Sequence, residues 1–216
     1  MPKEPDAGGA GPDDKAARAL ARLRRKAATC RECPLGERAT QTVWGEGLPH
    51  ARWMFVGEQP GDREDREGHP FIGPAGKLLA QALDELGWPR EGIYVTNAVK
   101  HFKFEWRGKI RKHKTPAQLE IIACHHWLES EIATVRPEVA VALGGTAARA
   151  LMGRAVKVMS ERGHWLQRED GLPVLVTLHP AALLRGDPAQ REAAVRAWVA
   201  DLRKAQRGPG RSKPAT

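Results

Sequence analysis

A strongly basic segment that follows an apolar run carries the side chains best suited to chemistry. From Tyr94 to Cys124 the chain reads YVTNAVKHFKFEWRGKIRKHKTPAQLEIIAC. The apolar run predicts a buried strand, at whose end Asn97 and His101 stand. The segment after it predicts a loop, in which His113 lies among five cations: Arg107, Lys109, Arg111, Lys112 and Lys114. Alone, this could be a solvated surface loop. Because ligands of open α/β sheets bind where the strands end, and phosphates attract cations, it indicates an anionic partner, nucleic acid above all.

Three cysteines form the second feature with chemical potential. Cys30 and Cys33 make a CxxC pair that is followed by Pro34, and Cys124 stands alone far along the chain. An odd number of cysteines without an export signal argues against a disulfide framework and favours metal, cluster or redox chemistry. The proline should end the preceding helix and expose backbone, as a cluster-binding turn requires.

Polar residues also stand at the exits of other predicted strands. The loop GEQPG brings Glu58 and Gln59 after one apolar run, and His179-Pro180 follows another. Taken singly, Glu58 could be a solvated carboxylate, Asn97 a turn or helix cap, and His179 a surface histidine. Because the exits of parallel strands meet at one edge of a sheet, polar residues at three of four exits indicate a single site.

Apolar runs alternate with helical patterns along the chain. This order predicts a three-layer α/β/α sandwich with a central, mostly parallel four-stranded sheet. The helix that begins at Pro116 carries Leu119, Ile122, Ala123 and Trp127 at helical spacing. The expected strands are 51–56, 93–97, 139–143 and 174–178, and the expected helices are 13–29, 77–86, the one from Pro116, 146–152 and 188–204.

Length and composition limit the protein classes. The chain has 216 residues, enough for one domain, which we place at 13–205 between disordered tails at 1–12 and 206–216. Its net charge of +9 favours nucleic acid or another anionic surface as partner. No apolar run approaches the roughly 20 residues that span a bilayer, and the N-terminus lacks a secretory apolar region. We therefore expect no membrane partner, a cytoplasmic location and, without a long apolar surface stripe, a monomer.

Five motifs in order give a family resemblance: GEQPG, GHPFIGPAG, YVTNAVKHFKF, KIRKHKTP and HPAALLR. With the CxxC pair upstream, they resemble the uracil-DNA glycosylase superfamily. More narrowly, they resemble its iron–sulfur branch called UdgX, whose members bond covalently to DNA at the excised uracil. The resemblance runs from about Cys30 to Lys204.

The resemblance implies how a flipped base would be held. Phe71 matches the position whose ring stacks on uracil, although core packing is the common role of a phenylalanine. Asn97 matches the position that reads the pyrimidine edge, for which an amide can both donate and accept. Further substrate contacts are implied for Gly57, Gln59 and Asp62, and the five cations named above would contact the DNA backbone.

The implied catalytic residues are His113, Glu58 and His179. His179 would donate a hydrogen bond to the uracil oxygen where charge develops. Many members have serines after this His-Pro pair, where this chain has Ala181 and Ala182, and Arg185 would compensate as a substrate or phosphate contact.

His113 matches the histidine that attacks the anomeric carbon. Surrounding cations would lower the pKa of this imidazole and so keep it neutral, and Glu58 would orient or deprotonate it. Ile110, between Lys109 and Arg111, departs from the order of residues that relatives show in this loop.

The same resemblance implies a [4Fe–4S] cluster held by Cys30, Cys33, His101 and Cys124. His125 and His126 compete with His101 as the fourth ligand, and a zinc site with the same residues is chemically possible.

The leading interpretation is a uracil-DNA glycosylase that prefers single-stranded or easily opened DNA and forms an adduct between His113 and the abasic sugar. A conventional glycosylase that releases uracil and turns over is the first alternative. A non-catalytic iron–sulfur or zinc module that binds nucleic acid is the second. A nucleotide-binding protein is excluded, because the phosphate-loop and dinucleotide patterns are missing from the sequence.

Overall fold

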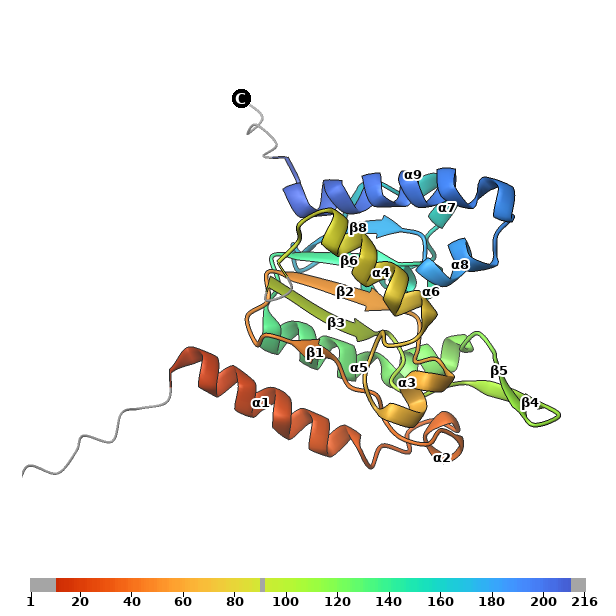
Figure 1. Cartoon of the computed structure of the whole chain (residues 1–216). Coiled ribbons are helices and arrows are strands. Elements are labelled where there is room, and N and C mark those ends of the chain that lie inside the picture. Colours follow the sequence, from red (N-terminus) through yellow and green to blue (C-terminus); the bar gives the residue numbers. More distant parts are fainter. Residues whose placement is uncertain (1–10, 90–91, 211–216) are drawn as a thin grey trace, which may run out of the picture.

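A six-stranded sheet forms the centre of the molecule (Figure 1). The computed structural model describes residues 11–89 and 92–210. The strand order is β1-β3-β2-β6-β8-β7. Four strands run parallel: β3 (Ile93–Asn97), β2 (Trp53–Gly57), β6 (Val139–Leu143) and β8 (Pro173–Thr177). The predicted parallel core is therefore confirmed. Two short antiparallel edge strands, β1 (Glu46–Gly47) and β7 (Trp165–Gln167), extend it beyond the expected four strands.

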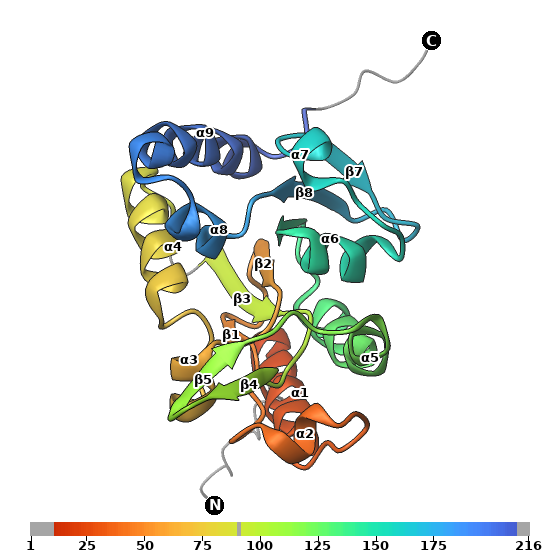
Figure 2. The same cartoon turned by 90° about the vertical axis from the view of Figure 1, so that its right-hand side faces the viewer.

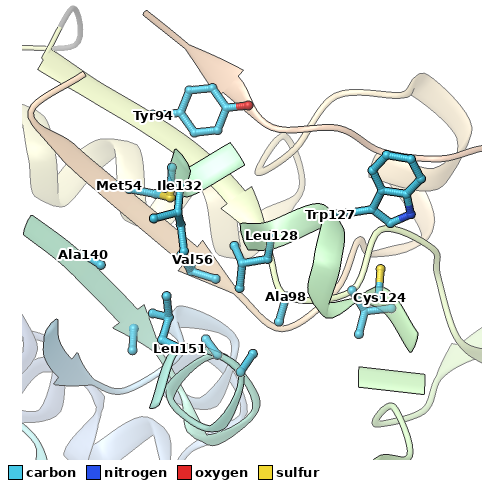
Figure 3. Packing of buried hydrophobic residues seen from close by; sticks show 14 of the residues in the cluster. Met54, Val56, Tyr94, Ala98, Cys124, Trp127, Leu128, Ile132, Ala140 and Leu151 are labelled. Carbon is cyan, nitrogen blue, oxygen red and sulfur yellow. The ribbon is translucent and has the colours of Figure 1, made fainter. Parts of the chain in front are cut away.

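Helices cover both faces of this sheet, because alternate residues of each buried strand point to opposite sides. Met54 and Val56 of β2 pack with α5 (Gln118–Val135) and α6 (Gly145–Met152), as Figure 3 shows. Phe55, between them, packs on the opposite face with α4 (Pro74–Glu85) and α9 (Pro188–Arg207). Helix α1 (Pro12–Ala27) lies against α5 and adds a further layer on that side.

Four of the five predicted helices begin within two residues of the predicted start, with α5 beginning at Gln118 rather than Pro116. Asp187 caps α9, since its carboxylate accepts a hydrogen bond from the Ala189 amide. Helix α4 starts three residues early, because Pro74 occupies its first turn. Of the predicted tails, residues 1–10 and 211–216 lie outside the described part, while α1 and α9 extend to 12 and 207. Four short helices were not predicted: α2 (Leu35–Arg38), α3 (Asp62–Glu67), α7 (Val158–Glu161) and α8 (Pro180–Arg185).

The apolar face of α5 differs from the predicted one. Leu119 and Ile122 are exposed, whereas Ile121 and Cys124 join Trp127 on the buried face. The set read at helical spacing therefore mixed two faces of the helix, and the prediction for Leu119 and Ile122 is wrong. None of the helices in the described ranges is long and apolar enough to cross a membrane.

The basic segment predicted as a loop is in fact a β-hairpin. Strand β4 (Phe104–Arg107) pairs with β5 (Ile110–His113) in antiparallel register. Gly108 opens the two-residue turn with a φ of 59°, a conformation that glycine adopts without steric penalty. Figure 1 shows the hairpin projecting from the body beyond α3, at the side toward which the parallel strands point.

Candidate functional site

A cavity of about 490 Å³ opens where the parallel strands end. Figure 2 looks at this side of the molecule, with α8 above, α3 to the left and the hairpin below. The structure brings the predicted catalytic residues and most predicted substrate contacts together in its wall. The members that line it are Glu58, Gln59, Asp62, Phe71, Asn97, His113, His179 and Arg185. Ala181 lines it as well.

His179 is held in one tautomer by the helix that it caps. Its Nδ1 accepts a hydrogen bond from the Ala181 amide at 3.1 Å, so the proton of the neutral ring sits on Nε2. Burial, together with the charges of Arg185 and His113, lowers the pKa of His179 to about 4. The ring is therefore a neutral donor at physiological pH.

Asn97 and Phe71 form the inner part of the cavity. Asn97 ends β3 and is buried, yet within the described ranges its side-chain amide has no hydrogen-bond partner. Phe71 has a φ of 57°, a strained conformation for this residue, and its ring stacks at 6.4 Å from that of His179. Gly57 makes room for both, since a Cβ there would lie 2.4 Å from Asn97 Oδ1 and 2.7 Å from Phe71 Cζ.

His113 meets Glu58 across the cavity. His113 Nε2 lies 3.3 Å from Glu58 Oε1, and Glu58 Oε2 accepts a hydrogen bond of 2.6 Å from Thr146. Partial burial lowers the pKa of His113 and Arg185 adds to this, whereas Glu58 opposes it. The predicted direction is thus found, but burial rather than the surrounding cations is its main cause. Thr146 was missed, although its place in the first turn of α6 after the Gly144-Gly145 pair was a usable signal.

The side chain of Gln59 holds the hairpin in place through hydrogen bonds to its flanking backbone. Its Nε2 donates to the carbonyls of Lys103 and Lys114, and its Oε1 accepts from the Lys103 amide. These two residues flank the hairpin, so one amide fastens both of its strands to the exit of β2. The prediction that Gln59 contacts base carbonyls is corrected for the side chain, whose polar groups are already paired; the loop backbone keeps that role as a prediction.

Arg111 also has a different place from the one predicted. Its side chain is only 6% exposed and pairs with Asp62 at 2.5 Å and Asp65 at 2.6 Å. Its guanidinium lies 4.9 Å from the centre of the Phe104 ring. Arg111 therefore docks the hairpin on α3 and is not free to contact DNA phosphates. The same ion pair occupies one carboxylate oxygen of Asp62. The other predicted backbone contacts are exposed: Arg107, Lys109, Lys112 and Lys114.

The three cysteines belong to one apolar cluster beside helix α5. Cys30 and Cys33 lie between α1 and α2 and pack against the apolar cluster that contains Cys124 of α5 (Figure 3 shows Cys124). The Trp127 indole donates to Cys30 Sγ at 3.4 Å, and the Lys100 amide donates to Cys124 Sγ at 3.2 Å. Burial, against the opposing effect of Lys100 and with a smaller contribution from the two other thiols, raises the pKa of Cys124 to about 12. Within 11–89 and 92–210, no three side chains are arranged to hold a single metal ion.

The buried ring of His101 is held in one tautomer. Thr42 Oγ1 donates to the Ala27 carbonyl, so it must accept from His101 Nε2, 2.9 Å away, which leaves Nδ1 with its lone pair. Burial, with Arg31, lowers the pKa of His101 and keeps it neutral. The competing histidines pair with carboxylates: His125 with Glu129 at 3.5 Å and His126 with Glu32 at 2.8 Å.

A buried ion pair between the cavity and the cysteines was not predicted. Lys100 is fully buried, and its Nζ donates to Glu131 at 2.5 Å, Thr96 at 2.7 Å and the Asn97 carbonyl at 2.7 Å. Tyr94 completes the group through a bond to Glu131. Because Glu131 lies on α5, no local pattern in the sequence connects it with Lys100.

The sequence is similar to known proteins over most of its length. The family model described as the uracil DNA glycosylase superfamily matches residues 44–203. A type-4 uracil-DNA glycosylase of Thermotoga maritima is 40% identical over 157 residues, which cover 72% of this chain and 78% of that protein. The type-4 enzyme of Archaeoglobus fulgidus is 32% identical over 200 residues, covering 88% and 93%. A type-5 uracil-DNA glycosylase of Pyrobaculum aerophilum is 29% identical over 172 residues, covering 69% and 72%.

Proposed function

The chain belongs to the uracil-DNA glycosylase superfamily, and from this premise we propose that it excises uracil from DNA and retains the abasic sugar on His113. Excision is supported by the family and by relatives named for that activity. The observation that carries the adduct is the position of His113, whose ring lines the same cavity as Asn97 and His179. Uracil in single-stranded DNA is the proposed substrate, because a base must leave the stack to enter such a cavity.

Recognition of the base uses the inner wall of the cavity. The ring of Phe71 offers a face on which uracil stacks, and the unpaired amide of Asn97 can donate to and accept from the pyrimidine edge.

Departure of the base is assisted by His179. The glycosidic electron pair leaves with uracil and places negative charge on the pyrimidine oxygens. Nε2–H of His179 donates toward that charge, and because the proton position is fixed by the Ala181 contact, the donor is preorganised. Donors of this kind contribute about 2.7–4 kcal/mol to transition-state stabilisation in other enzymes.

Capture of the sugar follows at His113. A lone pair of the neutral imidazole forms a bond to C1′ as the bond from C1′ to the base breaks, and the base takes the electron pair with it. The imidazolium that results carries a positive charge next to Glu58, whose carboxylate stabilises it and can take up its remaining ring proton. Thr146 fixes the orientation of Glu58.

A [4Fe–4S] cluster is the cofactor we propose for the cysteine region. Three thiols share one apolar cluster, and His101 follows the Lys100 amide that donates to Cys124. Thiolates and a neutral imidazole are donors that fit an iron–sulfur cluster, and the proposed ligands are Cys30, Cys33, Cys124 and His101. Bound there, the cluster would join the turn after α1 to α5 and the root of the hairpin, a structural role.

The test is a denaturing gel of the protein mixed with a uracil-containing single strand or an identical thymine strand. We expect a heat-stable, uracil-dependent shift that His113→Ala abolishes. His50→Ala is the matched control, because its side chain is 42% exposed against 43% for His113 and it lies outside the cavity. A shift that survives in His113→Ala refutes the adduct. Alkali-sensitive strands without a shift would identify a turnover glycosylase. The absence of both signals would refute excision itself.

A further inference from the structure

One exposed aromatic side chain stands on the basic hairpin. Trp106 is 59% exposed, and it is the single aromatic among the large apolar side chains exposed within the described ranges. Five other tryptophans are buried, and Trp165 is partly buried against the core. An indole left in water forfeits the burial that tryptophan normally gains, so its position calls for a partner that covers it.

The strand register places Trp106 on the same face of the hairpin as His113. Phe104 lies opposite His113, and Trp106 lies opposite Arg111, two pairs closer to the turn. Residues two apart along a strand share a face and are separated by about 7 Å. Trp106 and His113 are therefore diagonal neighbours across the two strands, about 7–8 Å apart, a distance comparable to that between neighbouring nucleotides in an extended single strand.

The indole rests on a rigid support. Its ring meets the Phe104 ring edge-on, with centroids 5.6 Å apart and planes at 88°. Phe104 is in turn covered by the Arg111 guanidinium, which α3 holds through Asp62 and Asp65. Because the support is fixed by two ion pairs, of which the one with Asp65 is buried, little conformational freedom remains to be lost when a flat partner stacks on Trp106.

The charges around Trp106 identify the chemistry of that partner. Lys109 is exposed in the turn next to this face, while Arg107 and Lys112 alternate with Trp106 and Arg111 and are exposed on the other face. The only acidic residue of the hairpin, Glu105, contacts Arg107 and Lys114. A narrow cationic hairpin that presents one aromatic ring suits a polyanion that carries flat rings, which is single-stranded nucleic acid. An apolar protein partner would leave these cations unpaired.

We propose that Trp106 stacks on the base next to the flipped uracil and so forms a second binding position of the site. This inference rests on the proposed function, since it takes the uracil strand as the ligand. Every base has a π face, so the position recognises the presence of a neighbouring unstacked base rather than its identity. It also favours single strands, in which that base is free to leave its neighbour.

The first experiment measures binding without chemistry. A thymine single strand is titrated into the protein while tryptophan emission is followed, and stacking on the exposed indole should quench it. We expect the quenching to be lost in Trp106→Phe while affinity is largely kept, and Trp106→Ala to weaken binding roughly 5- to 100-fold. Met159→Ala, another exposed apolar side chain placed on α7, should change neither signal.

The second experiment asks which base is contacted. Single-turnover reaction with uracil is compared between a full strand and strands that lack the base on the 5′ or the 3′ side of uracil. One of the two gaps should slow the wild type and leave the Trp106→Ala protein, already slower, unaffected, because the two changes remove the same contact.

The outcomes separate this inference from the proposed function. Normal excision with equal sensitivity to the gaps in wild type and Trp106→Ala refutes the stacking position and leaves the glycosylase intact. Quenching that depends on Trp106, without any reaction at uracil, refutes the proposed function and keeps the stacking position. An affinity and a degree of quenching in Trp106→Ala equal to those of the wild type also overturn the inference.

Discussion

Replacing Glu131 by glutamine should destabilise the protein far more than its distance from the cavity suggests. One oxygen of Glu131 accepts from Lys100 and Thr96, and the other accepts from Tyr94 and the Gly45 amide. Glutamine keeps the shape, but its NH₂ group must face one of these donor pairs, and the charge of fully buried Lys100 loses its counterion. Removal of one partner from a buried ion pair destabilises by about 3–5 kcal/mol.

Thermal or urea unfolding measures this effect. For a domain of this size each kcal/mol lowers the melting temperature by about 2–4 °C, so we expect a decrease of roughly 6–20 °C. Glu138→Gln is the matched control, because it breaks the Arg52–Glu138 pair, whose side chains are 49% and 66% exposed. An exposed pair contributes about 0–1 kcal/mol, so the control should melt close to the wild type.

A double variant separates the loss of charge pairing from the loss of packing. Lys100→Met added to Glu131→Gln removes the buried charge that lost its counterion, while the glutamine oxygen can still accept from Tyr94 and the Gly45 amide, so this double variant should recover much of the stability lost in Glu131→Gln. The reasoning is refuted if Glu131→Gln and Glu138→Gln have the same melting temperature, or if the double variant is less stable than Glu131→Gln.

Three further predictions concern the site. Gly57→Ala should reduce uracil excision at least tenfold with little change in melting temperature, because the added Cβ would lie 2.4 Å from Asn97 Oδ1; unchanged single-turnover rates would contradict it. Partial burial first, and then Arg185, lower the pKa of His113, and the adduct requires the unprotonated ring, so the rate should fall as pH drops through that pKa. Arg185→Ala raises this pKa, and the acid limb of a rate profile recorded from about pH 5 to 8 should move to higher pH; an unmoved midpoint would exclude the coupling. Lys109→Ala should decrease the slope of log affinity against log salt by about 0.7, measured with a thymine strand, and an unchanged slope would mean that no phosphate is bound there.

The parallel core was predictable because it depends on local patterns. The strands at 93–97 and 139–143 match the structure residue for residue, since their uninterrupted apolar runs suit a sheet covered on both faces. The edge strands β1 and β7 have two and three residues, too few for any period to be visible. The helix face of α5 was misjudged because apolar residues occur on both of its sides.

The hairpin was missed although a signal was present. In FEWRGKIRKH, Phe104 and Trp106 alternate with charged residues and Gly108 marks the turn, which is the pattern of a two-residue hairpin. The density of positive charge favoured a loop instead. The contacts of Gln59 and Glu131 could not be predicted, since each joins segments at least 31 residues apart through polar groups that no periodicity records.

Two separate sets of contacts position the two halves of the proposed reaction. Asn97 and His179 sit at the ends of β3 and β8, so the sheet itself fixes the part of the cavity that would bind and release uracil. His113 comes from the hairpin, which Gln59 and Arg111 fasten to the body by hydrogen bonds and ion pairs. Loosening the hairpin would therefore move the nucleophile without moving the base-binding wall. It follows that capture of the sugar and release of the base are structurally separable, and a chain with the same sheet but a differently held hairpin could release uracil without retaining the DNA.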